Sequence, residues 1–211
     1  MDGPHRQVLL VSPHFPPSGN PQAWQNYRLA RALAAGGLQV EVIAAGADRL
    51  EPSNSHAGGG LDPEGNIAVR RFRSAAPWAR SWGLTRRAYR MFHPLDPYFH
   101  QSGLLETLDR RLREARFDVI ISRAEPLVSH HALLERQELA GAARLVYWFS
   151  DPVPTSRTPE MMKLAWRRRR CEGLLEGCLR SGDLVIAATE EILEAFRGRR
   201  GGAETWVLPH T

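Results

Sequence analysis

The sequence predicts a doubly wound α/β fold, in which helices cover both faces of a mostly parallel sheet. Short, continuous apolar runs recur along the 211 residues, as is typical of strands that are buried on both faces. Between these runs lie longer stretches whose apolar residues follow helical spacing, and regular alternation of the two patterns favours a parallel sheet. Hydrophobic residues make up 43% of the chain and charged residues 24%, which are ordinary values for a globular domain.

The first strand–helix–strand unit lies at the start of the chain. Residues 7–12 form an apolar run that Pro13 closes, and a loop rich in proline, glycine and asparagine follows. Residues 22–35 have helical spacing and end at Gly36 and Gly37. Residues 38–44 are a second strand, and a crossover of this length is parallel and right-handed. The unit is therefore Rossmann-like.

The same alternation continues to the end of the chain, and we expect one domain over residues 1–211. Residues 45–66, which contain three consecutive glycines, are predicted to form an exposed, flexible loop. The remaining predicted elements are strands at 67–72, 118–122, 144–149, 183–187 and 204–208, and helices near 82–92, 101–115, 127–140, 159–180 and 190–197.

Composition limits the compartment and the partners. The formal charge of +5 comes almost entirely from arginine, since Lys163 is the only lysine, and it fits either an arginine-rich genome or an anionic partner. Cys171 and Cys178 are the only cysteines, and about 10 Å of helical rise would keep them from pairing. No signal peptide or apolar span is evident, so we expect a cytoplasmic protein. No nucleic-acid-binding motif accompanies the charge.

Ligands of open α/β sheets bind at the carboxyl ends of the strands, so the loops there are candidate sites. The first such loop, residues 12–21, contains His14, Gly19 and Asn20. A glycine lets backbone N–H groups approach a phosphate, and the following helix N-terminus adds partial positive charge. A rigid turn that merely leads into the helix is the alternative, and the dinucleotide fingerprint G-x-G-x-x-G is absent.

The second candidate loop contains Arg123 and Glu125, with His130 and His131 in the next helix. Arg123 is suited to pair with an anionic group and Glu125 to orient a sugar hydroxyl, although the two residues could instead satisfy one another at the surface. The adjacent histidines point about 100° apart, so at most one faces the cleft. Two such residues make a poor metal site, and we expect no metal.

The third candidate loop begins with Ser150 and Asp151, directly after the apolar run 144–149. A carboxylate at that strand end can accept hydrogen bonds from sugar hydroxyls or position an acceptor nucleophile. Capping the next turn is the alternative role for Asp151.

Together these segments resemble the N-terminal domain of family-4-like retaining glycosyltransferases, which is one half of a GT-B architecture. The resemblance spans almost the whole chain except residues 45–100. It rests on the order and spacing of four segments: VLLVSPHFPPSGNPQAWQNYRLARALAAGGLQVEVIAA, FDVIISRAEPL, VYWFSDPVP and GDLVIAATEEILEAF. The closing WVLPHT resembles that family's V-x-P-N-G turn, after which the donor-binding domain begins.

The resemblance implies an acceptor-side domain of an enzyme that moves a hexose-type sugar from a nucleotide sugar to a glycan or lipid-linked acceptor in bacterial envelope or polysaccharide synthesis. Where the family has two glycines near the donor diphosphate, this sequence has Gly19 followed by Asn20, and Pro21 removes one N–H donor. The nucleotide sugar is a substrate, and no cofactor is implied. The implied residues are Asp151 and Glu125 for catalysis, Arg123, His14, Ser150 and His130 for substrate, and Gly19 and Asn20 for donor phosphate.

The residues that hold most of the donor lie in the second domain of the family, so this chain alone should not turn over sugar. The second domain would follow in the same polypeptide or come from a partner subunit. Two other readings remain open. One is a non-catalytic module that binds a glycan or partner, and the other is half of a GT-B-fold sugar-nucleotide epimerase.

Two basic segments suggest peripheral contact with a membrane. Residues 78–92 mix tryptophan, tyrosine and phenylalanine with four arginines, a composition typical of helices that rest on anionic lipid. Four consecutive arginines, Arg167 to Arg170, occupy all faces of the helix predicted for 159–180. For residues 78–92 the alternative is packing of the aromatic rings on the sheet with the arginines outside, and for Arg167 to Arg170 it is a solvated helix face.

Overall fold

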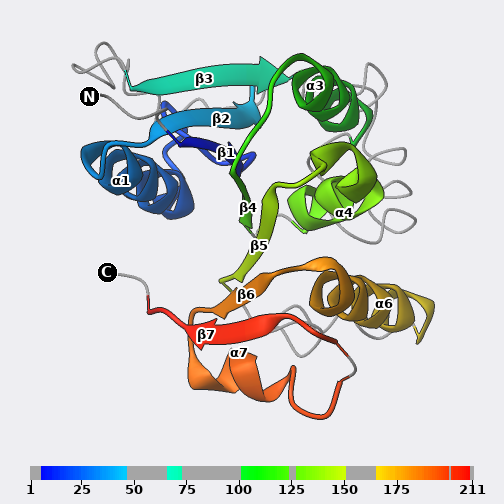
Figure 1. Cartoon of the computed structure of the whole chain (residues 1–211). Helices are drawn as coiled ribbons and strands as arrows, with labels where there is room; N and C mark the ends of the chain where they lie inside the picture. The colour runs from blue at the N-terminus through cyan, green and yellow to red at the C-terminus, as the bar shows by residue number, and fades with distance from the viewer. Residues whose placement is uncertain are drawn as a thin grey trace, which may run out of the picture.

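The computed structural model describes residues 6–46, 66–72, 101–123, 127–150, 165–199 and 201–209. In this part of the chain seven strands form one parallel sheet in the order β3-β2-β1-β4-β5-β6-β7 (Figure 1). The strands are β1 (Gln7–Val11), β2 (Gln39–Ala45), β3 (Ile67–Phe72), β4 (Val119–Arg123), β5 (Arg144–Phe149), β6 (Leu184–Ala187) and β7 (Glu204–Val207). The predicted doubly wound parallel sheet is confirmed.

The helices alternate with the strands as expected. They are α1 (Pro21–Ala35), α3 (Gln101–Glu114), α4 (Val128–Glu135), η4 (Gln137–Ala140), α6 (Ala165–Ser181) and α7 (Glu190–Glu194). The single helix predicted for 127–140 is wrong in one respect, because α4 ends at Glu135 and a 3₁₀ turn follows. The N–H of Arg136 bonds to the Leu133 carbonyl, three residues back, and this tightening ends the α-helical pattern. The predicted helix at 82–92 and nearly all of the 45–66 loop lie outside the described residues.

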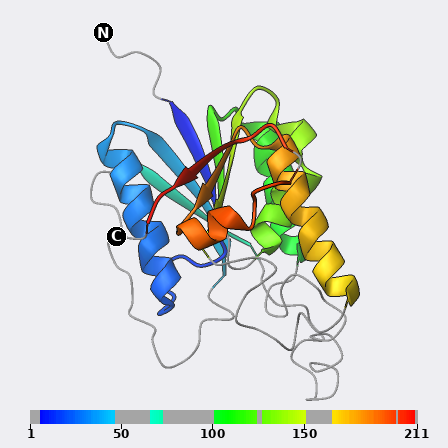
Figure 2. The ribbon, with the colours of Figure 1, turned by 90° about the horizontal axis from the view of Figure 1, so that it is seen from below.

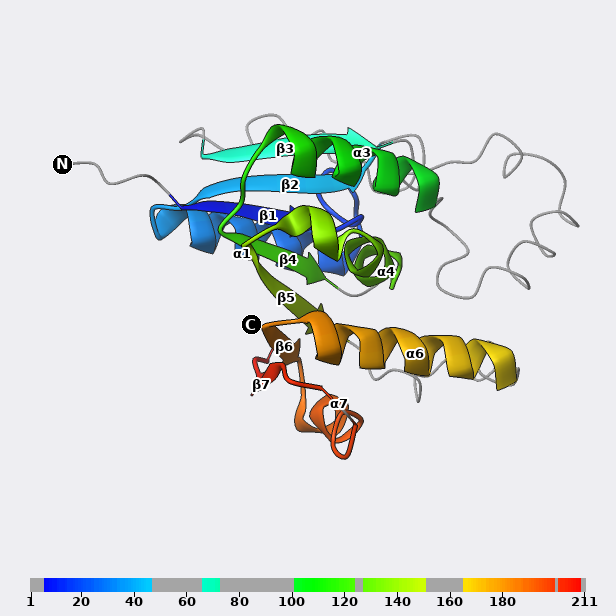
Figure 3. The ribbon, with the colours of Figure 1, turned by 45° about the vertical axis from the view of Figure 1, so that its right-hand side comes forward.

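The two faces of the sheet carry different helices. Helix α1 packs on one face through a cluster that includes Val8, Leu10, Val40 and Val42. Helices α3, α4 and α6 cover the other face, where Figures 2 and 3 show them opposite α1. Successive side chains of a strand point to opposite faces, so alternate residues of β1 enter the two clusters.

The strand order reverses beside β1. The chain builds β1, β2 and β3 outward to one edge and then crosses to β4 on the other side of β1. Ligands of open α/β sheets bind at such a switch point, outside the carboxyl ends of the strands. The loop from β1 to α1 and the ends of β4 and β5 therefore lie at the position where this fold favours a site.

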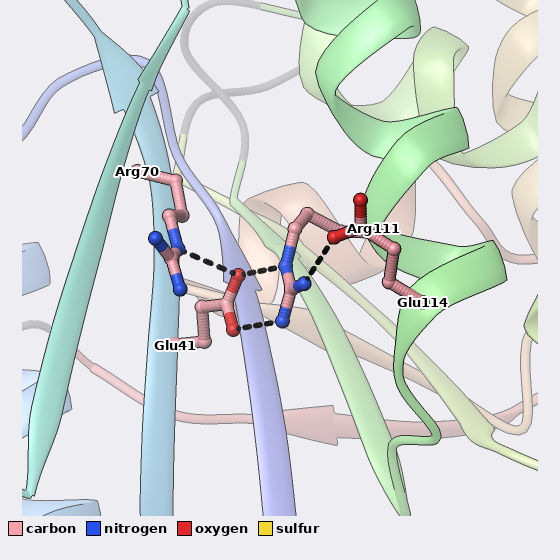
Figure 4. Close-up of polar contacts among 4 residues, drawn as sticks. All are labelled: Glu41, Arg70, Arg111 and Glu114. Atoms are coloured by element: carbon pink, nitrogen blue, oxygen red, sulfur yellow. Dashed lines mark hydrogen bonds and ion pairs between the residues drawn. The ribbon is translucent and has the colours of Figure 1, made fainter.

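One ionic cluster connects α3 to the sheet (Figure 4). Glu41 of β2 accepts hydrogen bonds from Arg111 Nε at 2.5 Å and Arg111 Nη2 at 2.7 Å, and Arg111 Nη1 bonds to Glu114 at 2.6 Å. Arg70 of β3 lies 3.6 Å from the same Glu41 carboxylate. The hydrogen bond to Glu41 is the main cause that raises the pKa of Arg111. The pair fixes one end of α3 against β2.

Candidate functional site

The loop between β1 and α1 is fixed by a buried asparagine of the helix. Asn26 is 1% exposed, and its Nδ2 donates to Ser12 Oγ at 2.5 Å and to the His14 carbonyl at 2.8 Å. Ser12 Oγ also donates to the His14 carbonyl, at 3.0 Å. Phe15, at 1% exposed, anchors the loop in the α1 cluster. The backbone ahead of Gly19 is therefore tied to the core.

Asn20 caps α1. Its Oδ1 accepts a hydrogen bond from the Gln22 N–H at 2.9 Å, its backbone is extended, and Pro21 occupies the first helical turn. Asn20 Nδ2 lies 3.5 Å from His14 Nε2, and burial lowers the pKa of His14 to about 4, so this imidazole is neutral at pH 7. Gly19 is exposed in front of the cap. The loop leads directly into α1, as the alternative interpretation of a rigid turn expected. Contact of Gly19 and Asn20 with the donor stays a prediction.

Arg123 ends β4 on the α1 face, and its guanidinium is buried. The whole residue is 2% exposed. Its Cζ lies 4.2 Å from the centre of the Trp148 ring, and its Nη2 lies 3.4 Å from Gln25 Oε1 of α1. Burial lowers the pKa of Arg123 to about 10. Across the described ranges, no carboxylate lies within ion-pair distance of this guanidinium.

Other buried polar atoms lie on α1 and at the ends of β4 and β5, the elements that meet near Arg123. Trp148 is its register partner on β5, and Ser150 follows two residues later. Arg123 Nε, Trp148 Nε1, Ser150 Oγ and Asn26 Oδ1 each lack a hydrogen-bond partner among the residues that the structure describes. Buried polar groups are normally paired, so this set favours a place where a polar molecule binds. It lies between α1 and the carboxyl ends of β4 and β5.

His130 lies on the opposite face of the sheet. Its Nδ1 is 2.7 Å from Ser122 Oγ, and its ring packs against Tyr147 and Phe149 at centroid distances of 5.5 and 4.4 Å. It is 0% exposed, and burial, helped by the charge of Arg123, lowers its pKa to about 3. The structure does not bring it together with His14 and Ser150, and its predicted contact with substrate remains untested. Its neighbour His131 pairs with Glu135 at 3.3 Å instead.

The two predicted catalytic carboxylates, Glu125 and Asp151, lie outside the described residues. The sequence did not single out Gln25, Asn26 or Trp148. The sequence did contain a signal for Asn26. This residue lies between Ala23 and Ala30 in the stripe of α1 that faces the core, so its amide is buried. A polar side chain in the buried stripe of a helix marks a loop or site that needs a hydrogen bond.

Comparison with solved structures agrees with the fold. Over 97% of this chain and 88% of the other, a sucrose-phosphate synthase from Thermosynechococcus elongatus superposes with a TM-score of 0.59 at 14% identity. Phytolacca americana UGT2, complexed with UDP-2fluoro-glucose and pterostilbene, gives 0.64 at 8% identity over 99% and 55% of the two chains. A UDP-N-acetylglucosamine 2-epimerase gives 0.55 at 12% identity over 96% and 48%. The chain spans about half the length of the last two proteins.

Sequence comparison identifies the family. No curated protein matches the chain significantly. The model of Glycosyltransferase Family 4 matches residues 22–210, which run from the first turn of α1 through β7 and include Arg123, Trp148 and Ser150. The expected resemblance is therefore confirmed, and the chain belongs to Glycosyltransferase Family 4.

Proposed function

We propose that this chain is the acceptor-side domain of a glycosyltransferase that moves a sugar from a nucleotide sugar to a glycan or lipid-linked acceptor. Membership of the family supports sugar transfer. The observation that carries the acceptor assignment is the set of buried polar atoms on Arg123, Trp148, Ser150 and Asn26, which lack hydrogen-bond partners among the described residues and belong to elements at the switch point of the sheet. We further propose that the transfer retains the configuration at the anomeric carbon and that the donor carries a hexose-type sugar.

On the acceptor side, the chemistry of Arg123 favours an anionic or strongly polar acceptor group. A guanidinium presents several donors in a fixed plane, and stacking on Trp148 holds that plane in one orientation. Ser150 adds a hydroxyl two residues beyond Trp148. Asp151 and Glu125 are proposed to orient or activate the acceptor hydroxyl, and His14 to contact it as a neutral imidazole.

On the donor side, we propose that Gly19 and the N-terminus of α1 face the diphosphate. The Asn20 side-chain oxygen caps α1 and so fixes the position of the helix N-terminus. The partial positive charge of that N-terminus then favours a phosphate in front of it. Most donor contacts would come from a second Rossmann-like domain, in the same polypeptide or in a partner subunit. That proposal is supported by the half-length coverage of UGT2 and the epimerase.

The test uses the full-length protein with UDP-glucose and UDP-N-acetylglucosamine as donor probes and a panel of glycan and lipid-linked acceptors. Appearance of a glycosylated product supports the proposal, and the anomeric proton coupling in its NMR spectrum decides between retention and inversion. Conversion of the sugar nucleotide to an epimer without an acceptor would favour the epimerase reading. Glycan binding without turnover would favour a binding module.

We also propose that the enzyme works at the cytoplasmic face of a bacterial membrane, in envelope polysaccharide synthesis. Within the described residues, no helix has the length and apolar character to cross a bilayer. The exposed Trp166 and Arg168 to Arg170 of α6 support peripheral contact, although Arg168 lies 3.9 Å from Glu172. The basic stretch 78–92 is outside the described residues. Flotation with anionic and with zwitterionic vesicles tests this, and equal recovery with both would contradict it.

A further inference from the structure

Two neighbouring arginines of β3 point to opposite faces of the sheet. Arg70 is on the α3 face, where it lies 3.6 Å from Glu41 (Figure 4). Arg71 is on the α1 face, the side on which Ile67 and Val69 pack. Neither residue was predicted from the sequence to have a functional role.

The Arg71 guanidinium binds backbone carbonyls in the β1–α1 loop and at the end of β2. Nη1 donates to the Ala45 carbonyl at 3.0 Å and to the Phe15 carbonyl at 3.5 Å, and Nη2 donates to the Pro16 carbonyl. Burial lowers the pKa of Arg71. Among the ion pairs of the described ranges none includes Arg71, and backbone oxygens accept its hydrogen bonds there. One side chain thus joins the end of β2 to the loop.

These contacts complete the attachment of the loop. Asn26 holds its first part through Ser12 and the His14 carbonyl, and Arg71 holds Phe15 and Pro16. Within the described residues, the hydrogen bonds of Ser18 and Asn20 are short-range, such as the bond from the Ser18 N–H to the Phe15 carbonyl at 3.3 Å. Gly19 therefore lies between the Asn20 cap of α1 on one side and the Phe15 and Pro16 carbonyls that Arg71 binds on the other.

We propose that Arg71 is a positioning residue for donor binding, which holds the Phe15 and Pro16 carbonyls so that Gly19 and the N-terminus of α1 are presented to the diphosphate in one arrangement. The inference rests on the proposed function, because the diphosphate is the donor's. Arg71 itself touches no substrate in this scheme. Preorganising a binding loop lowers the entropy lost when a ligand binds, so the effect should appear in donor affinity.

The test compares Arg71→Met, which keeps the length of the side chain but removes its donors, with Arg71→Lys, which restores a positive charge. Arg70→Met is the matched control, since it removes the same chemistry from the same strand on the other face. In the full-length enzyme, Arg71→Met should raise the donor KM about tenfold while the acceptor KM and kcat change little. Arg71→Lys should recover part of the loss, and Arg70→Met should leave the donor KM unchanged.

Hydrogen exchange gives a readout that needs no donor. Arg71→Met should speed amide exchange in residues 12–20, including Ser18, and Arg70→Met should not. Unchanged exchange in that loop, or a donor KM equal to that of the wild type, would overturn the inference. If the wild-type enzyme binds neither UDP-glucose nor UDP-N-acetylglucosamine, while Arg71→Met still loosens the loop, the loop attachment stands and the proposed function is what fails for those donors.

Discussion

The same substitution at two arginines should have opposite consequences. Arg111 and Arg123 both have little exposed surface, but Arg111 is paired with a carboxylate, whereas Arg123 has no such partner in the described ranges. Methionine keeps much of the length and packing of an arginine and removes its charge and donors. Arg111→Met and Arg123→Met therefore compare a structural arginine with one that is proposed to serve substrate.

For Arg111, the magnitude follows from its pair with Glu41. Two charges about 4 Å apart attract by roughly 4 kcal/mol at an effective dielectric constant of about 20. Removing one partner of a fully buried pair costs about 3–5 kcal/mol, and an exposed pair contributes about 0–1 kcal/mol. The side chains of Arg111 and Glu41 are 15% and 12% exposed, so their pair resembles the buried case more than the exposed one. We therefore expect Arg111→Met to lower the free energy of unfolding by about 2–3 kcal/mol.

For Arg123, the opposing contributions nearly cancel. The variant loses a stacking contact with Trp148 that is worth about 1–2 kcal/mol, and a weak bond to Gln25 at 3.4 Å. It also removes a buried charge whose desolvation costs several kcal/mol. We expect the free energy of unfolding to stay within about 1 kcal/mol of the wild type, while kcat/KM for the acceptor falls at least about tenfold.

Urea unfolding of this chain and acceptor kinetics of the full-length enzyme measure the two effects. Glu41→Gln with Arg111→Met should cost less than the sum of the single variants, because each single variant already removes the same ion pair between Arg111 and Glu41. Arg144→Met, an exposed arginine at the start of β5, is the neutral control for both assays. If Arg123→Met is as destabilising as Arg111→Met, Arg123 has a structural partner and the reasoning fails. A stable, fully active Arg123→Met would remove Arg123 from the acceptor site.

Two further variants test the packing and the electrostatics of the fold. Gly201→Ala would place a Cβ 2.5 Å from the Leu179 carbonyl oxygen, which is backbone and cannot rotate away, so Tm should fall by an amount that corresponds to about 1–3 kcal/mol. Gly202→Ala meets nothing within 4 Å and should change stability by less than about 0.5 kcal/mol; equal effects of the two would contradict the packing. His130 has its pKa lowered to about 3, so between pH 6.5 and 3 the unfolded state binds the extra proton and stability falls as pH falls. His130→Asn, which can keep the bond to Ser122, should reduce the slope of unfolding free energy against pH by up to about 1.4 kcal/mol per pH unit between pH 6 and 5, and an unchanged slope would refute the buried, neutral histidine.

Much of the fold follows from local patterns in the sequence. Residues 145–149 are continuously apolar because both faces of β5 are covered, and the strand Arg144–Phe149 was predicted with the observed bounds. The helix predicted for 190–197 also ends early, at Glu194. The failed boundary between α4 and η4 carries no glycine or proline. Gly141, at φ 63°, comes only after the 3₁₀ turn. Nothing local at Arg136 distinguishes a tightened turn from a continuing helix, so tertiary packing decides where α4 ends.

The sequence predicted which loops form the candidate site, but it did not predict which residues contact the side chains of those loops. Arg123 and Ser150 were identified because they follow strands, but Trp148 became relevant only through the pairing of β4 with β5. Arg71 was missed for a similar reason. Its acceptors are carbonyls of the Phe15–Pro16 segment and of Ala45, and backbone oxygens leave no trace in side-chain patterns. Register and backbone contacts of this kind depend on the assembled sheet.

The alternation of side chains along a strand narrows the search for the residues that touch substrate. Ser122 and Arg123 are consecutive in β4, so they must point to opposite faces. His130 bonds to Ser122 and therefore belongs to the α3–α4 face, whereas Arg123 meets Trp148 and Gln25 on the α1 face. The exposed Gly19 and the N-terminus of α1 are on that second side. Arg123 substitutions should thus change catalysis with little effect on stability, and His130 substitutions should change stability and its dependence on pH, because the two side chains lie on opposite faces of the sheet.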